Sequence, residues 1–188
     1  MSMVIDEILD NIKTLEQDLE REFDARREQL RYRLERRKVL FEQGVAESHR
    51  RLRMGVLTFW RNSGILNFIT SPVIYALIVP LMVLDLSLCI FQWVCFPIYG
   101  IRRVPRSDFI VLDRHHLAYL NWVEKLNCAY CGYANGVIAF GREIASRTEK
   151  RWCPIKHARR VRGVHHRYYA FDDYGDAQSY RQHMNDRT

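Results

Sequence analysis

Apolar residues recur every three or four positions along the first quarter of the chain. This spacing is that of a coiled-coil seam, and it is carried by Ile5, Ile8, Ile12, Leu15 and Leu19. The seam then shifts by four residues, to Phe23, Leu30, Leu34 and Phe41, and such a shift locally unwinds a supercoil. We predict one long coiled-coil-like helix over residues 3–48, in a first domain of residues 1–49. It would pair with a second copy or a partner protein; the alternative is a solvated helix packed on its own protein.

The pattern changes to a long apolar run in the next domain, residues 50–103. Residues 62–101 contain a single charge, Asp85, and about 20 apolar residues suffice to cross the hydrocarbon core of a bilayer. Arginines alternate with apolar residues over 50–69, which is typical of a helix in the headgroup plane. Ser71 and Pro72 then read as the N-cap and first residue of the helix that enters the membrane.

The topology of this segment has two readings. Basic residues flank both of its ends, so the positive-inside rule gives no orientation. A helix from Trp60 to Trp93 would span about 50 Å, too long for one crossing. We predict a re-entrant or tight hairpin anchor, bent near Pro80, with both termini cytoplasmic. A single kinked crossing helix over residues 72–96 is the alternative. Asp85 is a functional candidate if it lies at membrane depth, or a hydrated residue at the apex of the hairpin.

Charge is distributed unevenly along the chain. The net charge is +7, and the excess of basic residues follows residue 50, where it crowds the flanks of the apolar segment. A basic surface beside a membrane predicts contact with anionic lipid headgroups, and nucleic acid is a less expected partner. Residues 104–170 form a cysteine- and histidine-containing module, and residues 171–188 form a polar tail that we expect to be loose.

Four residues of this module have the spacing of a zinc site. Cys128 and Cys131 are separated by two residues, and Cys153 and His157 by three. Thiolate and imidazole are the ligands that structural zinc prefers. Cys153 precedes Pro154 and would cap a short basic helix over 154–162. The site closes only if the chain folds back between the two pairs, and Asn135-Gly136 is a hairpin signal.

A second reading moves the site. If residues 134–150 are helical instead, they would pair antiparallel with a helix over 114–126. Cys153 and His157 would then meet His115 and His116 in a mixed-ligand site, open to water and suited to a metalloenzyme or redox protein. The third reading is plain buried cysteines.

The stretches LNCAYCGYANG, REIASRT and WCPIKHARR resemble a family of small bacterial inner-membrane proteins of undefined function. The resemblance implies a location in the bacterial inner membrane and nothing about a reaction. The sequence thus predicts a mainly α-helical chain with a membrane-embedded helical segment. Its expected function is that of a zinc-binding scaffold or interaction protein on the cytoplasmic face, and the alternative is a membrane-bound metalloenzyme or redox protein.

Overall fold

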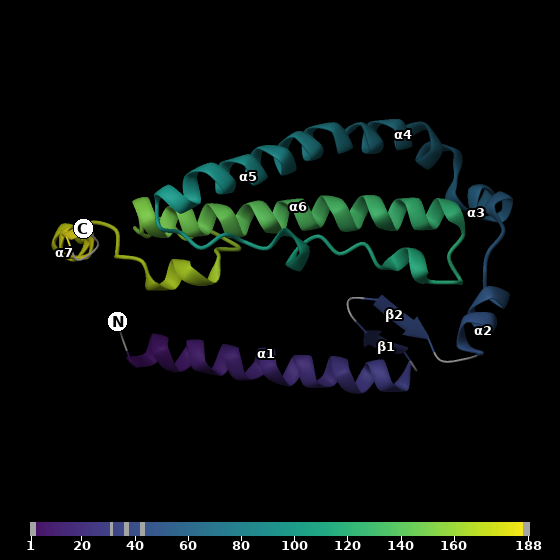
Figure 1. Cartoon of the computed structure of the whole chain (residues 1–188), viewed down its shortest axis with the longest axis horizontal. Coiled ribbons are helices and arrows are strands. Elements are labelled where there is room, and N and C mark those ends of the chain that lie inside the picture. The colour runs from purple at the N-terminus through teal and green to yellow at the C-terminus, as the bar shows by residue number, and fades with distance from the viewer. Residues whose placement is uncertain (1–2, 31, 36–37, 42–43, 186–188) are drawn as a thin grey trace. The chain divides into compact units, whose positions relative to one another are not determined.

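The structure, a computed structural model, describes residues 3–30, 32–35, 38–41 and 44–185. This part of the chain is mainly helical, as the sequence predicted (Figure 1). It divides into two compact units, one of residues 1–69 with 112–129, and one of residues 70–111 with 130–188.

The N-terminal helix is shorter than predicted. Helix α1 spans Met3–Gln29, and strands β1 (Tyr32–Glu35) and β2 (Lys38–Phe41) follow as an antiparallel hairpin. Helix α2 spans Val45–Arg51. The prediction of a single helix over 3–48 is therefore wrong beyond Gln29. Basic residues crowd positions 31–38 of the sequence, and like charges three or four residues apart destabilise a helix. The turn residues 36–37 lie outside the described residues.

In the rest of the first unit, His49 and Asn121 make contacts between segments that are distant in the sequence. Helix α3 spans Val56–Ser63, and the short 3-10 helix η2 spans Arg114–His116. The ring of His49 contacts the rings of Phe41 and Tyr119 edge-on, each at 5.4 Å between centroids. Asn121 Nδ2 donates a hydrogen bond of 3.5 Å to the carbonyl oxygen of Met54.

Helix α6, Trp122–Trp152, is a single helix of 31 residues. Its start is set by a capping box. The side chain of Asn121 accepts hydrogen bonds from the backbone N–H groups of Val123 and Glu124, both at 3.0 Å. The Glu124 carboxylate accepts one from the Asn121 N–H at 2.8 Å. The helix that we predicted over 114–126 is therefore wrong, and the signal missed was the N-x-x-E spacing.

The apolar segment forms a helix that does not turn back. Helix α4 (Ile65–Ala76) continues into α5 (Ile78–Ile98) with only Leu77 between them. Pro72 lies inside α4, so the predicted helix start at Ser71-Pro72 is wrong. The predicted hairpin near Pro80 is also wrong, because the helix runs on past that residue. Its end is set by Gly100, whose φ is +67°, where the N–H of Ile101 bonds back to the carbonyl oxygen of Phe96 at 2.8 Å.

In the second unit, α5 and α6 lie side by side and run in the same direction (Figure 1). Contacts advance together along the continuous α4–α5 helix and α6. Tyr75 of α4 contacts Tyr130 near one end, and Tyr99, which directly follows α5, contacts Trp152 near the other. Residues 99–111, here called the return segment, carry the chain back along them. The core consists of Phe96, Val104, Phe140 and Ile144, contributed by α5, the return segment and α6.

Gly136 explains how closely the return segment approaches α6. A Cβ atom on Gly136 would lie 2.7 Å from the carbonyl oxygen of Phe109 and 3.0 Å from the Cα of Ile110. No side chain fits at that distance, so glycine permits the crossing. Asn135-Gly136, which predicted a hairpin turn, is instead a point of close packing within a helix.

The C-terminal residues after α6 are ordered by hydrogen bonds. Residues 154–162 are not helical, contrary to prediction; Ile155 instead forms a parallel bridge with Asp172. A 3-10 helix, η3, spans His166–Ala170, and α7 spans Ala177–Asn185. Asp176 caps α7 by accepting from the N–H of Ser179 at 3.0 Å. The prediction of a loose tail over 171–188 is therefore wrong for the described part of it.

Candidate functional site

The four predicted zinc ligands are not brought together. Cys128 and Cys131 lie within α6, and Cys153 follows its last residue. At 1.5 Å per residue the helix separates Cys131 from Cys153 by about 33 Å, whereas ligands of one zinc ion lie within about 4 Å of each other. His157 is engaged elsewhere, because its backbone N–H and its Nδ1 contact the hydroxyl of Tyr168 at 2.7 and 3.1 Å.

The alternative site lacks the helical hairpin that it required. His115 and His116 lie in η2 before α6, while Cys153 and His157 follow that helix. The two adjacent histidine rings contact each other instead, with centroids 3.9 Å apart. Within the described part of the chain, no three His, Cys, Asp or Glu side chains are placed to hold a metal ion.

Asp85, the single charge of the apolar segment, is the centre of a buried polar cluster. Its side chain is buried, with the residue only 6% exposed. Arg106 lies in the 3-10 helix η1 (Arg106–Asp108). Its guanidinium donates two hydrogen bonds to the carboxylate, from Nε at 2.9 Å and from Nη2 at 2.6 Å. The hydroxyl of Tyr133 on α6 donates a third bond at 2.9 Å. Asp85 therefore joins α5, the return segment and α6.

The contacts of this cluster set the charge states of Tyr133 and Asp85. Burial and the hydrogen bond to Asp85 raise the pKa of Tyr133 above its ordinary value, so the phenol keeps its proton and remains a donor. A carboxylate that accepts a forked pair of guanidinium bonds is held ionised. Two turns further along α5, on the same buried face, the side chain of Gln92 accepts a hydrogen bond from the backbone N–H of Val104 at 2.9 Å. The seven-residue spacing of Asp85 and Gln92 was the sequence signal for this polar face, and it was missed.

A second ionic cluster docks the C-terminal residues on α6. Glu143 accepts hydrogen bonds from Arg147 at 2.8 Å and from Arg167 at 2.7 and 2.8 Å. Burial alone would raise the pKa of Glu143, but the bonds from Arg167 and Arg147 lower it from 4.5 to about 2. Arg167 also donates to Ser146 at 2.8 Å, and His165 contacts Glu149 at 2.8 Å.

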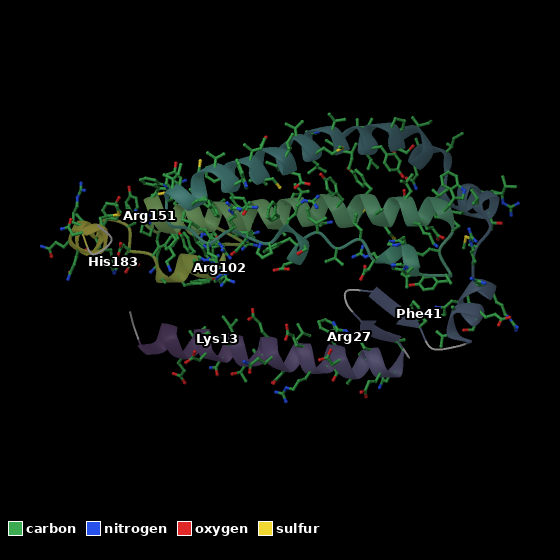
Figure 2. All side chains as sticks on the ribbon, viewed as in Figure 1. Lys13, Arg27, Phe41, Arg102, Arg151 and His183 are labelled. Atoms are coloured by element: carbon green, nitrogen blue, oxygen red, sulfur yellow. The ribbon has the colours of Figure 1, made fainter. Side chains whose placement is uncertain are left out.

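Beside this cluster lies a shallow hollow, open to solvent and lined by cations, here called the basic pocket. Its volume is about 540 Å³, and it lies where α5 and α6 end; Figure 2 labels two of its cations, Arg102 and Arg151. The lining residues are Tyr99, Gly100, Ile101, Arg102, Arg147, Lys150, Arg151 and Arg167. Five of these eight residues are basic and none is acidic, so the pocket is suited to an anion.

An apolar groove lies between the second halves of α5 and α6. Its volume is about 380 Å³, and its lining is almost wholly apolar. The lining residues are Leu88, Phe91, Ile144, Ala145, Thr148, Glu149, Trp152 and Cys153. Trp152, which lines the groove, contacts Tyr99, which lines the basic pocket, with ring centroids 5.1 Å apart. One ring of this aromatic pair therefore lines each hollow.

Comparison with known proteins adds no relative. No family model, no curated protein and no solved structure matches the chain. The resemblance to small bacterial inner-membrane proteins stays a prediction.

Proposed function

We propose that this protein attaches to one face of a membrane, with the α4–α5 helix lying in the membrane surface, and serves there as a scaffold or interaction protein. The observation that carries the proposal is the exposed apolar surface of this helix. Ile65–Ile98 is long and apolar enough to cross a membrane, and only 6% of its most apolar stretch is buried in the chain. A core helix of a soluble protein would be covered instead.

The two sides of α5 differ sharply in character. The covered side carries Asp85, Gln92 and Phe96, which contact the return segment and α6. The exposed side is mainly apolar and includes Val79, Met82, Val83, Leu86, Ile90, Trp93 and Ile98. The hydroxyl of Ser87, which is also exposed, donates to the carbonyl oxygen of Val83 at 2.8 Å. A helix with one lipid-compatible side and one protein-covered side is suited to the interface plane.

A perpendicular crossing is less favourable because of the return segment. The segment lacks regular helix between residues 99 and 105, and lipid-exposed irregular backbone does not occur in the hydrocarbon core. It also carries charge beside Asp85, about 10 Å along α5 from Ile78. The side chain of Arg106 is 45% exposed, and Asp108 is exposed as well. Each such charge would cost about 3 kcal/mol at the centre of a bilayer.

An in-plane helix also accommodates the length of the apolar segment. The 34 residues of Ile65–Ile98 span about 50 Å, against a hydrocarbon thickness of about 30 Å. In the membrane surface no mismatch arises. Both ends of the segment then lie on the same side, which fits the prediction of two cytoplasmic termini. The resemblance to bacterial inner-membrane proteins supports the cytoplasmic membrane as the location.

The interaction part of the proposal rests on α1. The apolar side chains of Ile8, Ile12, Leu15, Leu19 and Phe23 are all at least 43% exposed. They keep the three- and four-residue spacing of a seam, and i,i+3 ion pairs such as Lys13–Asp10 lie beside it. A second copy of α1 is the partner that we propose. Zinc is not part of the proposal, because α6 holds the predicted ligands apart.

The topology can be tested by labelling single cysteines from each side. In a variant without the five native cysteines, Arg61→Cys and Arg103→Cys place thiols at the two ends of the apolar helix, and both native side chains are exposed. A membrane-impermeant maleimide should label both from the same side, in inside-out vesicles only. Labelling of the two positions from opposite sides would establish a crossing helix and refute the in-plane arrangement. Recovery of the whole protein without detergent in the soluble fraction would refute membrane attachment itself.

A further inference from the structure

We infer that the basic pocket binds the phosphate group of an anionic lipid, with an acyl chain of that lipid in the apolar groove. This inference rests on the proposed membrane attachment and assigns a specific ligand class to one site. It differs from the general attraction of a basic surface to an anionic membrane, because it requires particular residues in particular positions.

The first argument is the charge of the pocket. Arg102, Arg147, Lys150, Arg151 and Arg167 all line it. Two of them, Arg147 and Arg167, are paired with Glu143, which offsets one positive charge and holds both guanidinium groups in place. No acidic residue lines the pocket. Phosphate is the anion that several guanidinium groups bind best, through forked hydrogen bonds to its oxygens.

Second, Arg102 adds to the pocket a cation that comes from outside α6. Basic residues in the last turn of a helix interact favourably with its carbonyl end, and Lys150 and Arg151 occupy the last turn of α6. That role does not account for Arg102, which comes from the return segment and whose side chain is exposed. Its backbone carbonyl accepts from Arg147 at 2.6 Å, which fixes the backbone of Arg102 beside the pocket.

The third argument is the neighbouring groove. A phosphate in water needs no apolar surface, whereas a phospholipid brings an acyl chain attached to its headgroup. Leu88, Phe91, Ala145 and Trp152 line the groove, and Trp152 contacts Tyr99, which lines the basic pocket. Aromatic side chains are enriched at the level of lipid headgroups, so the pair lies at the boundary between the two parts of such a ligand.

The direct test compares two double variants of equal charge. Arg102→Gln with Lys150→Gln alters two residues that line the pocket. Arg103→Gln with Arg160→Gln removes two exposed charges outside its lining. Phosphatidic acid and phosphatidylcholine are titrated into the detergent-solubilised full chain, and bound lipid is counted by native mass spectrometry. Detergent micelles remove the surface potential of a membrane, so both double variants would show equal affinity if only general charge mattered.

We expect one phosphatidic acid per chain, bound at least tenfold more tightly than phosphatidylcholine. Arg102→Gln with Lys150→Gln should weaken the binding of phosphatidic acid tenfold or more. Arg103→Gln with Arg160→Gln should keep its affinity for phosphatidic acid within twofold of that of the wild type. Equal losses in both variants, or equal affinity for the two lipids, would overturn the inference. Same-side labelling of the helix ends would be unaffected by that outcome, so failure here is distinct from failure of the membrane proposal.

Two further arms separate a lipid from free phosphate. Ala145→Trp fills the groove, and Ala139→Trp on an exposed position of the same helix serves as its control. A lipid ligand predicts at least fivefold weaker phosphatidic acid binding for Ala145→Trp alone. If instead inorganic phosphate at millimolar concentration displaces the lipid and Ala145→Trp has no effect, the pocket binds phosphate and the acyl-chain part of the inference is wrong.

Discussion

Replacement of Arg106 by alanine should release the return segment from α5 and α6. In the native chain Arg106 donates two hydrogen bonds to the buried carboxylate of Asp85, and Tyr133 donates one. The variant leaves an ionised carboxylate in an apolar helix with one strong donor. Water can reach it only through the space that the guanidinium vacates.

The expected loss follows from the burial of the two partners. Breaking a fully buried ion pair by removing one member costs about 3–5 kcal/mol. Asp85 is buried, but the side chain of Arg106 is 45% exposed, so water replaces part of the lost interaction. We therefore expect Arg106→Ala to lower the stability of the folded return segment by about 2–3 kcal/mol. Tyr133→Phe removes one bond to a charged group and should cost about 1.5 kcal/mol.

Hydrogen exchange of the backbone amides gives a local measure of this loss. Amides of residues 104–110 in the detergent-solubilised protein should exchange about 30- to 150-fold faster in Arg106→Ala. Arg103→Ala, an exposed neighbour of equal charge, should change the rates by less than about twofold. A double-mutant cycle with Asp85→Ala should give a coupling of about 2 kcal/mol. A coupling below about 0.5 kcal/mol, or unchanged exchange in Arg106→Ala, would show that the pair does not hold the return segment.

Gly136→Ala should lower the free energy of unfolding by about 1–3 kcal/mol, because the added methyl group meets the backbone of the return segment at 2.7 Å. Gly141→Ala should lower it by less, because only a movable leucine side chain lies within reach of its methyl group. The pKa of Glu143 in the folded chain is about 2. Its ionised carboxylate therefore contributes about 3 kcal/mol to the free energy of unfolding above pH 4.5, and this contribution is lost as the pH falls towards 2. Glu143→Gln should remove this pH dependence from urea unfolding curves. Leu15→Cys, 66% exposed on the α1 stripe, should form disulfide-linked dimers under mild oxidation. Cys153→Ser should change the free energy of unfolding by less than about 0.5 kcal/mol, with or without a zinc chelator.

Each of these has an outcome that contradicts it. Equal losses for the two glycine variants would place the return segment away from α6. An acid transition that persists in Glu143→Gln would assign it to other carboxylates. Equal cross-linking of Leu15→Cys and Glu16→Cys, which lies on another face of α1, would argue against a specific seam. If a zinc chelator lowered the free energy of unfolding of the native chain, a zinc ion would contribute to its stability.

Sequence patterns predicted what depends on neighbouring residues. The low charge of residues 62–101 identified the apolar helix, because the cost of placing charge in lipid is a property of composition. The alternative of a helix over residues 134–150 agrees with the continuous helix α6, which contains that range. The local stop of α1 and the cap at Asn121 were also present in the sequence, as a run of like charges and as N-x-x-E.

Only the tertiary structure decided which distant residues meet. Asp85 finds its partners 21 and 48 positions away, and no periodicity links residues at such separations. The same is true of Gly136, whose neighbour is the backbone of residues 109–110. The cysteine and histidine spacing predicted a zinc site because it assumed a turn; an unbroken helix of 31 residues puts the same side chains far apart, since rise per residue and not spacing in the sequence sets the distance between ligands.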